Sequence, residues 1–400
     1  MLVCVVVVLG LSACKKEQGC TDPLATNYDE NAEEDDNSCV YELSYPIPST
    51  YSFTDTAGNN TVSFNGQAQR LEMLSEMTSL MKTTNTSGTA VNAADLHAMY
   101  ANEGFSWNDA EGLGMTGSSK NLKSKTAAPN GTPDPAIQQH FEDLMAALES
   151  ASANTVAGDP QGGPGVAGVV VSTTNNSKMY LQSAQGMEYT QLIEKGLMGA
   201  VFLNQISAVY LGSDKMNVDN TTAVEPANGK YYTEMEHHWD EAFGYFTTAT
   251  DYPASGTDRF WGKYATSRNE VMDGIADNIF QAFLNGRAAI VNNDMETRDA
   301  QIAIIRTELE RVAAGTAIHY LNAANSTFAD DALRNHSLSE AIAFMDAVAY
   351  SHEPRLSFSE VNALKSELGD DFYAVTAMNI LSVRDQVAAA FNLDSIKDQL

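Results

Sequence analysis

Apolar side chains recur every three or four residues through most of this 400-residue chain, the spacing at which they line one face of an α-helix. The clearest example is Leu71–Met81, which reads Leu-Glu-Met-Leu-Ser-Glu-Met-Thr-Ser-Leu-Met. Further helices are predicted at residues 136–148, 182–211, 265–290, 296–324, 339–350, 359–368 and 372–391. Amphipathic helices in such number bury their apolar faces by packing on one another, so the sequence predicts an all-α fold built of helical bundles.

Three stretches interrupt this pattern. Residues 45–63 are rich in Pro, Ser, Thr and Asn and predict an extended lead-in. Residues 108–134 are rich in Gly, Ser, Lys and Pro and predict a long loop. The glycine-proline cluster 158–168 matches no phosphate-binding loop and is interpreted as a turn, and Val169–Val171 after it is the best strand candidate.

The start of the chain has the pattern of a bacterial lipoprotein signal. Residues 2–13 are uncharged and too short to cross a bilayer, which takes about 20 apolar residues. Leu11-Ser-Ala-Cys14 looks like a lipobox, so residues 1–13 are interpreted as a signal peptide and Cys14 as the acylated residue. Lys15 after Cys14 gives no sign of inner-membrane retention. We therefore expect an outer-membrane anchor, with the protein on the periplasmic or surface-exposed face.

The next segment, residues 14–45, is predicted to be a small acidic module and tether. In an exported chain, Cys20 and Cys39 are expected to form one disulfide. The residues between them resemble a CTDP…DDGSC module found in exported bacterial proteins. The carboxylate and amide oxygens of this segment could bind calcium, with Asp29, Asn31, Asp35 and Asp36 as the candidate ligands. The alternative is that the segment is a solvated acidic stalk.

The charge balance limits the classes of partner. The chain has 52 acidic and 23 basic residues, a net charge of −29. Such a surface repels phosphate backbones, so nucleic-acid binding is not expected. It attracts cations, which is compatible with metal handling. The 44% hydrophobic content is sufficient for a large core.

The segment 231–246 has the most informative chemistry. At 100° per residue, the side chains of Glu234, His238, Glu241 and Tyr245 share one stripe of a helix. Beside it lies an apolar core stripe, formed by Met235, Trp239, Ala242 and Phe246. Imidazole nitrogen and carboxylate oxygen are ligands for iron, zinc or manganese, so His238, Glu241 and Glu234 are candidate metal ligands. The alternative is that they are structural hydrogen-bonding groups.

Other polar residues are candidates for the same site or its surroundings. Glu188 lies near the start of a predicted long helix in which Gly196 and Gly199 indicate close packing against neighbouring helices. His319 lies in an apolar helix and is either a site residue or a satisfied core histidine. Glu340 is either a site residue or, in Ser337-x-x-Glu340, a helix cap. His-Glu-x-x-His and Gly-x-Ser-x-Gly are absent from the sequence, which lowers the expectation of hydrolase activity.

Four segments together resemble the imelysin-like family of exported bacterial proteins, in an uncharacterised lipoprotein branch. They are Gly66–Leu74, Glu194–Ala200, His238–Tyr245 and Leu338–Phe344. The family pattern is Gly-x-His-x-x-Glu; His238 and Glu241 match it, whereas Glu236 replaces the glycine. The resemblance implies two packed helical halves, here residues 46–225 and 226–400, with the His and Glu in a cleft. It also implies a link to iron uptake.

Three functions are compatible with these features. The first is a membrane-anchored lipoprotein that binds iron, another transition metal or a metal-bearing ligand, acting with an outer-membrane iron-transport system. The second is a metallohydrolase that uses the same His238 and Glu241. The third is a surface lipoprotein that binds a nutrient or protein without metal.

Overall fold

The computed structural model describes residues 18–23, 28–35, 43–86, 88–156, 161–253 and 258–400. The chain divides into two compact units, residues 1–47 and 48–400. Cys14, Asp36 and Cys39 lie outside the described residues, so the lipidation, the disulfide and part of the calcium prediction remain predictions. Among the described residues, no helix has the length and apolar character needed to span a membrane.

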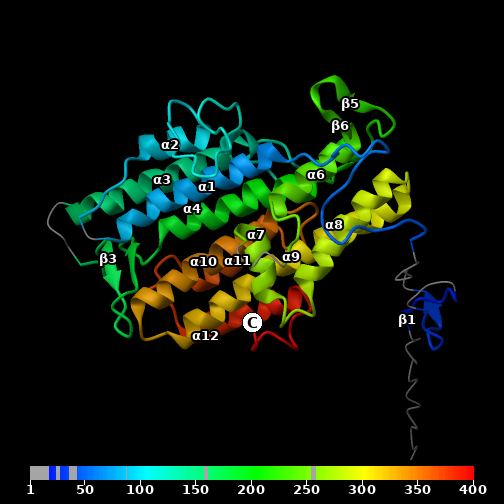
Figure 1. The fold of residues 1–400 in the computed structure, drawn as a ribbon. Coiled ribbons are helices and arrows are strands. Elements are labelled where there is room, and N and C mark those ends of the chain that lie inside the picture. The colour runs from blue at the N-terminus through cyan, green and yellow to red at the C-terminus, as the bar shows by residue number, and fades with distance from the viewer. Residues whose placement is uncertain (1–17, 24–27, 36–42, 87, 157–160, 254–257) are drawn as a thin grey trace, which may run out of the picture. The chain divides into compact units, whose positions relative to one another are not determined.

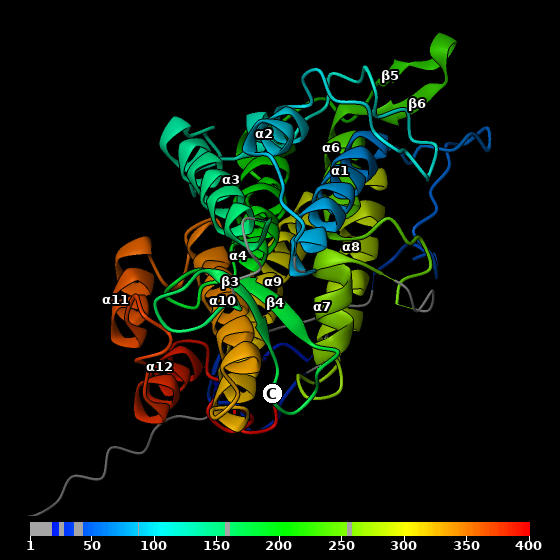
Figure 2. The ribbon, with the colours of Figure 1, turned by 90° about the vertical axis from the view of Figure 1, so that its left-hand side faces the viewer.

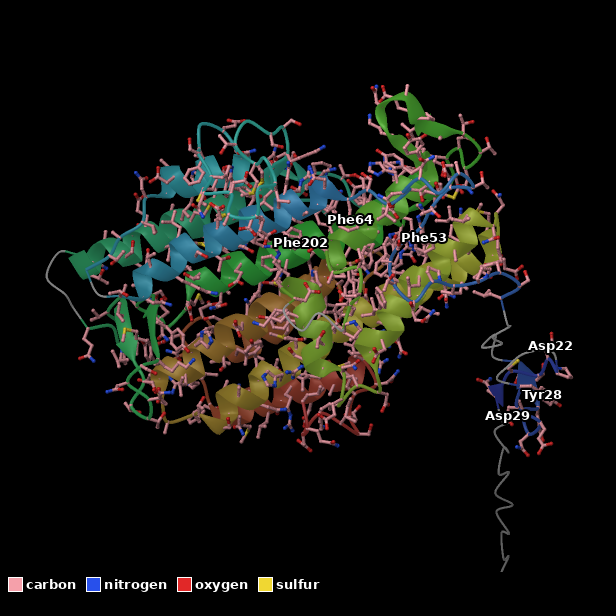
Figure 3. All side chains as sticks on the ribbon, in the orientation of Figure 1. Asp22, Tyr28, Asp29, Phe53, Phe64 and Phe202 are labelled. Atoms are coloured by element: carbon pink, nitrogen blue, oxygen red, sulfur yellow. The ribbon has the colours of Figure 1, made fainter. Side chains whose placement is uncertain are left out.

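The first unit has a two-residue parallel pairing of strands β1 (Gln18–Gly19) and β2 (Glu34–Asp35). Cys20 is buried, and its backbone bridges that of Tyr28, whose ring is exposed (Figure 3). One carboxylate oxygen of Asp29 accepts hydrogen bonds from the backbone and side-chain nitrogens of Asn31, at 2.9 and 3.2 Å. This contact closes a local turn, a common role for aspartate.

The second unit is mostly helical with a few short strands, which agrees with the predicted all-α class (Figure 1). Its α-helices are α1 (Asn65–Lys82), α2 (Ala93–Ala101), α3 (Pro135–Val156), α4 (Tyr189–Leu197), α5 (Ser213–Met216), α6 (Glu234–Phe246), α7 (Phe260–Arg268), α8 (Ile275–Val291), α9 (Met295–Ser326), α10 (Asp331–Ala349), α11 (Phe358–Leu368) and α12 (Ala377–Ala390). Short 3-10 turns are η1 (Thr83–Asn85), η2 (Lys123–Lys125) and η5 (Pro226–Asn228). Helices from both expected halves pack on each other within this one unit.

The longest helix, α9, is the centre of the packing. It contacts α7, α8, α10 and α12, and α10 in turn packs on α4. Helices α1, α2, α3 and α4 form the adjoining layer, drawn at the top of Figure 1. α6 connects the two layers because it contacts both α1 and α8. The residues expected to form its core stripe are buried, from Met235 to Phe246.

The strands are confined to small hairpins. β3 (Gly168–Val171) pairs antiparallel with β4 (Met179–Gln182), with Val169 opposite Leu181 (Figure 2). This confirms the strand at Val169–Val171, but the predicted helix 182–211 begins only at Tyr189. A second hairpin, β5 (Ala223–Glu225) and β6 (Lys230–Thr233), leads directly into α6 and was not predicted.

Several helices differ from their predicted bounds: α3 continues to Val156, α10 begins at Asp331, and α12 begins only at Ala377. The predicted helix 265–290 is divided into α7 and α8. The division falls where Asp273 and Gly274 have positive φ angles of 51° and 77°, a conformation that ends a right-handed helix. α2 was not predicted because its nine residues are too few for a clear periodicity.

The helix that begins as α4 continues through two π-helical segments, η3 (Met198–Leu203) and η4 (Gln205–Tyr210). π-Helical turns are rare and occur frequently at functional sites. The expected close packing of the two glycines is confirmed. A Cβ on Gly196 would lie 2.7 Å from the Phe141 ring, and one on Gly199 would lie 2.6 Å from the Ala347 Cα.

Candidate functional site

α6 has a well-defined start that fixes the direction of its side chains. The Thr233 hydroxyl accepts from the Glu236 backbone N–H, and the Glu236 carboxylate accepts from the Thr233 N–H, a complete capping box. This helix then carries polar groups on two faces. One face contains His238 and Glu241, and the other contains Asp240 with Glu236.

On the first face, His238 and Glu241 form a hydrogen-bonded pair. The Nδ1 atom of His238 lies 3.0 Å from Oε2 of Glu241. An ionised carboxylate only accepts hydrogen bonds, so Nδ1 carries the proton and the lone pair of a neutral imidazole is on Nε2. That Nε2 atom is buried and has no hydrogen-bond partner among the described residues. The nearest carboxylate oxygen is Oε1 of Glu234, at 3.7 Å.

Neighbouring helices complete a polar chamber around this pair. Gln67 on α1 donates from Nε2 to Oε1 of Glu241 at 3.0 Å, and the same nitrogen lies 3.4 Å from the Tyr210 hydroxyl on η4. The Tyr245 ring is fully buried with its centroid 6.0 Å from that of Tyr210. Its hydroxyl has no partner of good hydrogen-bond geometry among the described residues.

The electrostatics of the chamber follow from burial and from nearby charge. Burial, offset in part by the charge of Arg70, raises the pKa of Tyr245 to about 12. Burial also tends to raise the pKa of Glu241, but hydrogen bonds from His238 and Gln67 lower it overall. Burial and repulsion from Arg70 lower the pKa of Lys125, whose Nζ lies 5.6 Å from the centre of the Tyr210 ring.

On the second face of α6, a buried ion cluster joins the lead-in, α6 and α8. Arg287 donates to Asp240 at 2.9 Å and to Glu236 at 2.7 Å. Asp240 also accepts from the Tyr51 hydroxyl at 2.8 Å and from the Ser63 backbone N–H at 3.0 Å. Thus the Glu236 that replaces the glycine of the family pattern both caps α6 and pairs with a buried arginine.

Aromatic rings surround this cluster. The ring of Tyr51 stacks on that of Phe243 with centroids 3.6 Å apart, and Phe64 meets Phe243 edge-to-face at 5.6 Å. The Arg287 guanidinium lies 4.9 Å from the centre of the Phe53 ring. The ion cluster is therefore enclosed by apolar groups and water is kept from it.

The ability of the chamber to hold a metal depends on its donor atoms. Among the described residues, no group of three or more His, Cys, Asp and Glu side chains is arranged to hold an ion. His238 and Glu241 were expected to face one ion together, but they bond to each other instead. The remaining free donor is Nε2 of His238, with Glu234 beside it. These two fit an ion whose other ligands come from water or from a bound molecule.

Two other predicted site residues belong to a different cluster. Glu188 is fully buried, and its Oε2 lies 2.6 Å from Nδ1 of His336, which stacks on Tyr180. Glu340 lies 3.7 Å from the ammonium of Lys195, which also pairs with Glu194 at 2.8 Å. These residues connect α4 to α10 and do not contact His238. In Ser337-x-x-Glu340 the structure has no cap, because both residues lie within α10.

His319 lies apart from both clusters, on α9 beside Tyr320, with ring centroids 5.1 Å apart. Burial and the charge of Arg268 lower its pKa to about 4. The residue is half-buried, and both alternatives for it, a site residue or a satisfied core histidine, remain predictions.

The sequence analysis missed Gln67, Arg70, Tyr210 and Arg287. A signal for the first two was available, since both lie in the segment Gly66–Leu74 that supports the family resemblance. Arg287 is a lone cation in the apolar run Ala282–Ile290, a position where a buried ion pair is expected.

The fold and the site together define a mostly helical second unit with a hydrogen-bonded His238–Glu241 pair on α6. The model of the family described as "Domain of unknown function (DUF4856)" matches residues 48–394, and the chain belongs to this family. The match covers the second unit and excludes the acidic module. No curated protein and no solved structure matches the chain. The resemblance to the imelysin-like family stays a prediction.

Proposed function

We propose that this protein is an imelysin-like lipoprotein, anchored by acylated Cys14, that binds a transition metal or a metal-bearing ligand in iron acquisition. The observation that carries the proposal is the Nε2 atom of His238, a buried nitrogen without a hydrogen-bond partner among the described residues. Buried polar atoms are normally satisfied, and an exception calls for an explanation, for which a bound ligand, ion or water molecule is one.

The environment of His238 suits a metal ligand. Metal-binding histidines typically donate the other ring N–H to a carboxylate, which fixes the tautomer and the ring orientation. Glu241 has that position, and Gln67 holds Glu241 in turn. In this arrangement His238 is the ligand and Glu241 orients it.

Glu234 is the second donor. Two ligands that each lie about 2 Å from one ion are about 3–4 Å apart, and the separation of 3.7 Å between Nε2 of His238 and Oε1 of Glu234 is compatible with this. The Glu234 side chain is 54% exposed, so an ion here would be reached from the surface. A hydrolytic zinc site typically has three protein ligands, and two are present, which favours binding over hydrolysis.

The test is a titration with cobalt(II), whose visible absorption spectrum reports nitrogen and oxygen ligation, together with elemental analysis for iron. The unsubstituted protein should bind, and His238→Ala and Glu234→Gln should each weaken binding at least tenfold. His237→Ala is the matched control, because the Nδ1 atom of His237 already bonds the Ser63 carbonyl at 3.0 Å. Equal losses in all three variants, or no binding by the unsubstituted protein, would refute the metal site.

The membrane anchor is tested separately. Cys14→Ser removes the acylated residue, and the variant should leave the outer-membrane fraction. Continued membrane association of Cys14→Ser would contradict the lipoprotein assignment and leave the metal proposal unaffected.

A further inference from the structure

A second site is indicated by basic residues that lack ion-pair partners. Of the lysines and arginines in the described part of the chain, nine have no carboxylate oxygen within 4.0 Å: Arg70, Lys120, Lys125, Lys178, Lys215, Lys263, Arg268, Arg306 and Arg355. In a chain with 52 acidic residues, carboxylate partners are abundant. A local group of unpaired cations therefore needs an explanation.

Two of these cations, Lys215 and Arg306, line one cavity of about 670 Å³. Its wall is formed by the end of η4, by α5, by residues 130–132 and by one side of α9. We call this space the α9 cavity. Its other basic groups are Arg298 and His352, and its acidic groups are Asp214 and Asp299. The volume lies in the range typical of small-molecule sites, about 300–1,000 Å³.

Arg306 has the clearest unfulfilled hydrogen-bonding capacity. Its Nε donates to the Ser207 carbonyl at 2.9 Å, and one Nη donates to the Leu211 carbonyl at 3.0 Å. A guanidinium has five N–H donors, so donors on the side away from these carbonyls remain available. Burial lowers the pKa of Arg306, and the charge of Glu353, which forms no ion pair with it, offsets this only in part, so the guanidinium charge is poorly solvated. Neutral carbonyls compensate a buried charge less well than an anion does.

The acidic residues of the cavity do not supply that anion. Asp299 already pairs with Arg298 at 2.7 Å, and Arg298 also donates to the Met216 carbonyl. Asp214 is exposed on α5 and has no ion pair within the described residues. The remaining positive charges of Lys215 and Arg306 thus face the cavity together, with His352 on the same wall.

The rest of the lining indicates the kind of anion. Val209, Ile302 and Ala303 give the cavity apolar wall beside the charged groups. The carbon skeleton of a small organic anion could pack against this apolar wall. An inorganic ion has no apolar part and would leave the wall exposed to water. The protein's charge of −29 disfavours a large polyanion, because most of its surface would repel it.

We propose that the α9 cavity binds a small organic oxyanion, a di- or tricarboxylate, between Lys215 and Arg306. The lining of this cavity includes neither Tyr210 nor His238, and it uses none of the proposed metal ligands. It therefore goes beyond the proposed function and does not depend on it.

The experiment is calorimetric titration of the purified full chain with tricarballylate, a tricarboxylate without the hydroxyl group of the stronger chelators. Lys215→Ala should weaken binding at least fivefold, and Arg306→Lys, which keeps the charge but loses the fork of donors, should weaken it less than Arg306→Gln. Lys178→Ala removes the same charge from an exposed, unpaired lysine in the β3–β4 hairpin and should change binding less than twofold.

Each other outcome has a defined meaning. No binding of tricarballylate, or equal losses for Lys215→Ala and Lys178→Ala, overturns the proposal. Inorganic phosphate bound as tightly as tricarballylate overturns the organic part of it. His238→Ala should leave tricarballylate binding unchanged while it removes cobalt binding, so failure of one site is distinguishable from failure of the other. Circular dichroism of each variant confirms folding.

Discussion

The two polar faces of α6 contrast in how completely their groups are satisfied. On one face, Arg287 and Tyr51 are buried and both donate to buried Asp240, so each of these groups has a hydrogen-bond partner. On the other, His238 and Tyr245 are also buried, yet each has one polar atom without a partner of good hydrogen-bond geometry among the described residues, and Arg70 interacts only weakly with the Tyr245 hydroxyl. The same helix thus carries one hydrogen-bond network that is satisfied internally and one that has unpartnered atoms.

This difference distinguishes buried polar groups that stabilise the fold from buried polar groups that are available to a ligand. A buried network that is satisfied internally fixes the packing of the elements it joins, here α6, α8 and the lead-in. A buried polar group that is left unsatisfied costs about 1–3 kcal/mol and persists where a ligand compensates it. The two faces of α6 are both buried and both carry charged groups, so it is the presence of unpartnered polar atoms that distinguishes the candidate site from the ion cluster.

The largest effect is expected for Arg287→Ala, which leaves Asp240 and Glu236 buried without their counter-ion. Removing one partner of a buried pair typically costs about 3–5 kcal/mol. Urea unfolding at pH 7 should show this loss. Arg311→Ala is the matched control, because Arg311 pairs with Glu308 near the surface and should cost about 0.5 kcal/mol. A cost below 1 kcal/mol for Arg287→Ala would remove the distinction between the two faces.

The fold class was predictable from the sequence because helical periodicity is local. Leu71–Met81 and Val169–Val171 were each recognised from their own residues. The break between α7 and α8 was not, since Ile275 continues the apolar pattern across it. The π-helical geometry of η3 and η4 was not predictable either, because it arises from packing and hydrogen bonding that residue spacing does not encode.

The site was predictable only in part, for a related reason. The stripe of His238, Glu241 and Tyr245 follows from helix geometry within one segment. Gln67 and Tyr210 approach it from α1 and η4, which are distant in sequence. Spacing also cannot show that Glu241 would bond His238 instead of sharing an ion with it. That distinction depends on rotamers, which the tertiary contacts select.

An intermediate effect is expected from a matched pair of tyrosines. Tyr51→Phe removes a hydroxyl that donates to Asp240 at 2.8 Å, and a hydrogen bond to a charged group contributes about 1.5–3 kcal/mol. Tyr245→Phe removes a hydroxyl with no partner of good geometry, so its unfolding free energy should change by less than about 0.5 kcal/mol, or rise. Thermal and urea unfolding measure both. Equal costs would mean that the Tyr245 hydroxyl is satisfied after all.

A further modest effect concerns Glu241 and depends on pH. The folded-state pKa of Glu241 is lowered below its ordinary value, so the unfolded chain binds this proton more readily. Its contribution to stability is therefore complete above about pH 4.5 and is lost as the pH falls through the folded-state pKa. Glu241→Gln should cost about 1 kcal/mol at pH 7, and the difference from the unsubstituted protein should shrink as the pH falls below 4.

Urea unfolding at pH 7, 5, 4 and 3 measures this difference in unfolding free energy. Glu103→Gln, at an exposed position, is the control and should show little difference at any of these pH values. A difference that grows toward low pH would contradict the assigned direction. It would also mean that the carboxylate of Glu241 is not what holds the His238 ring in place.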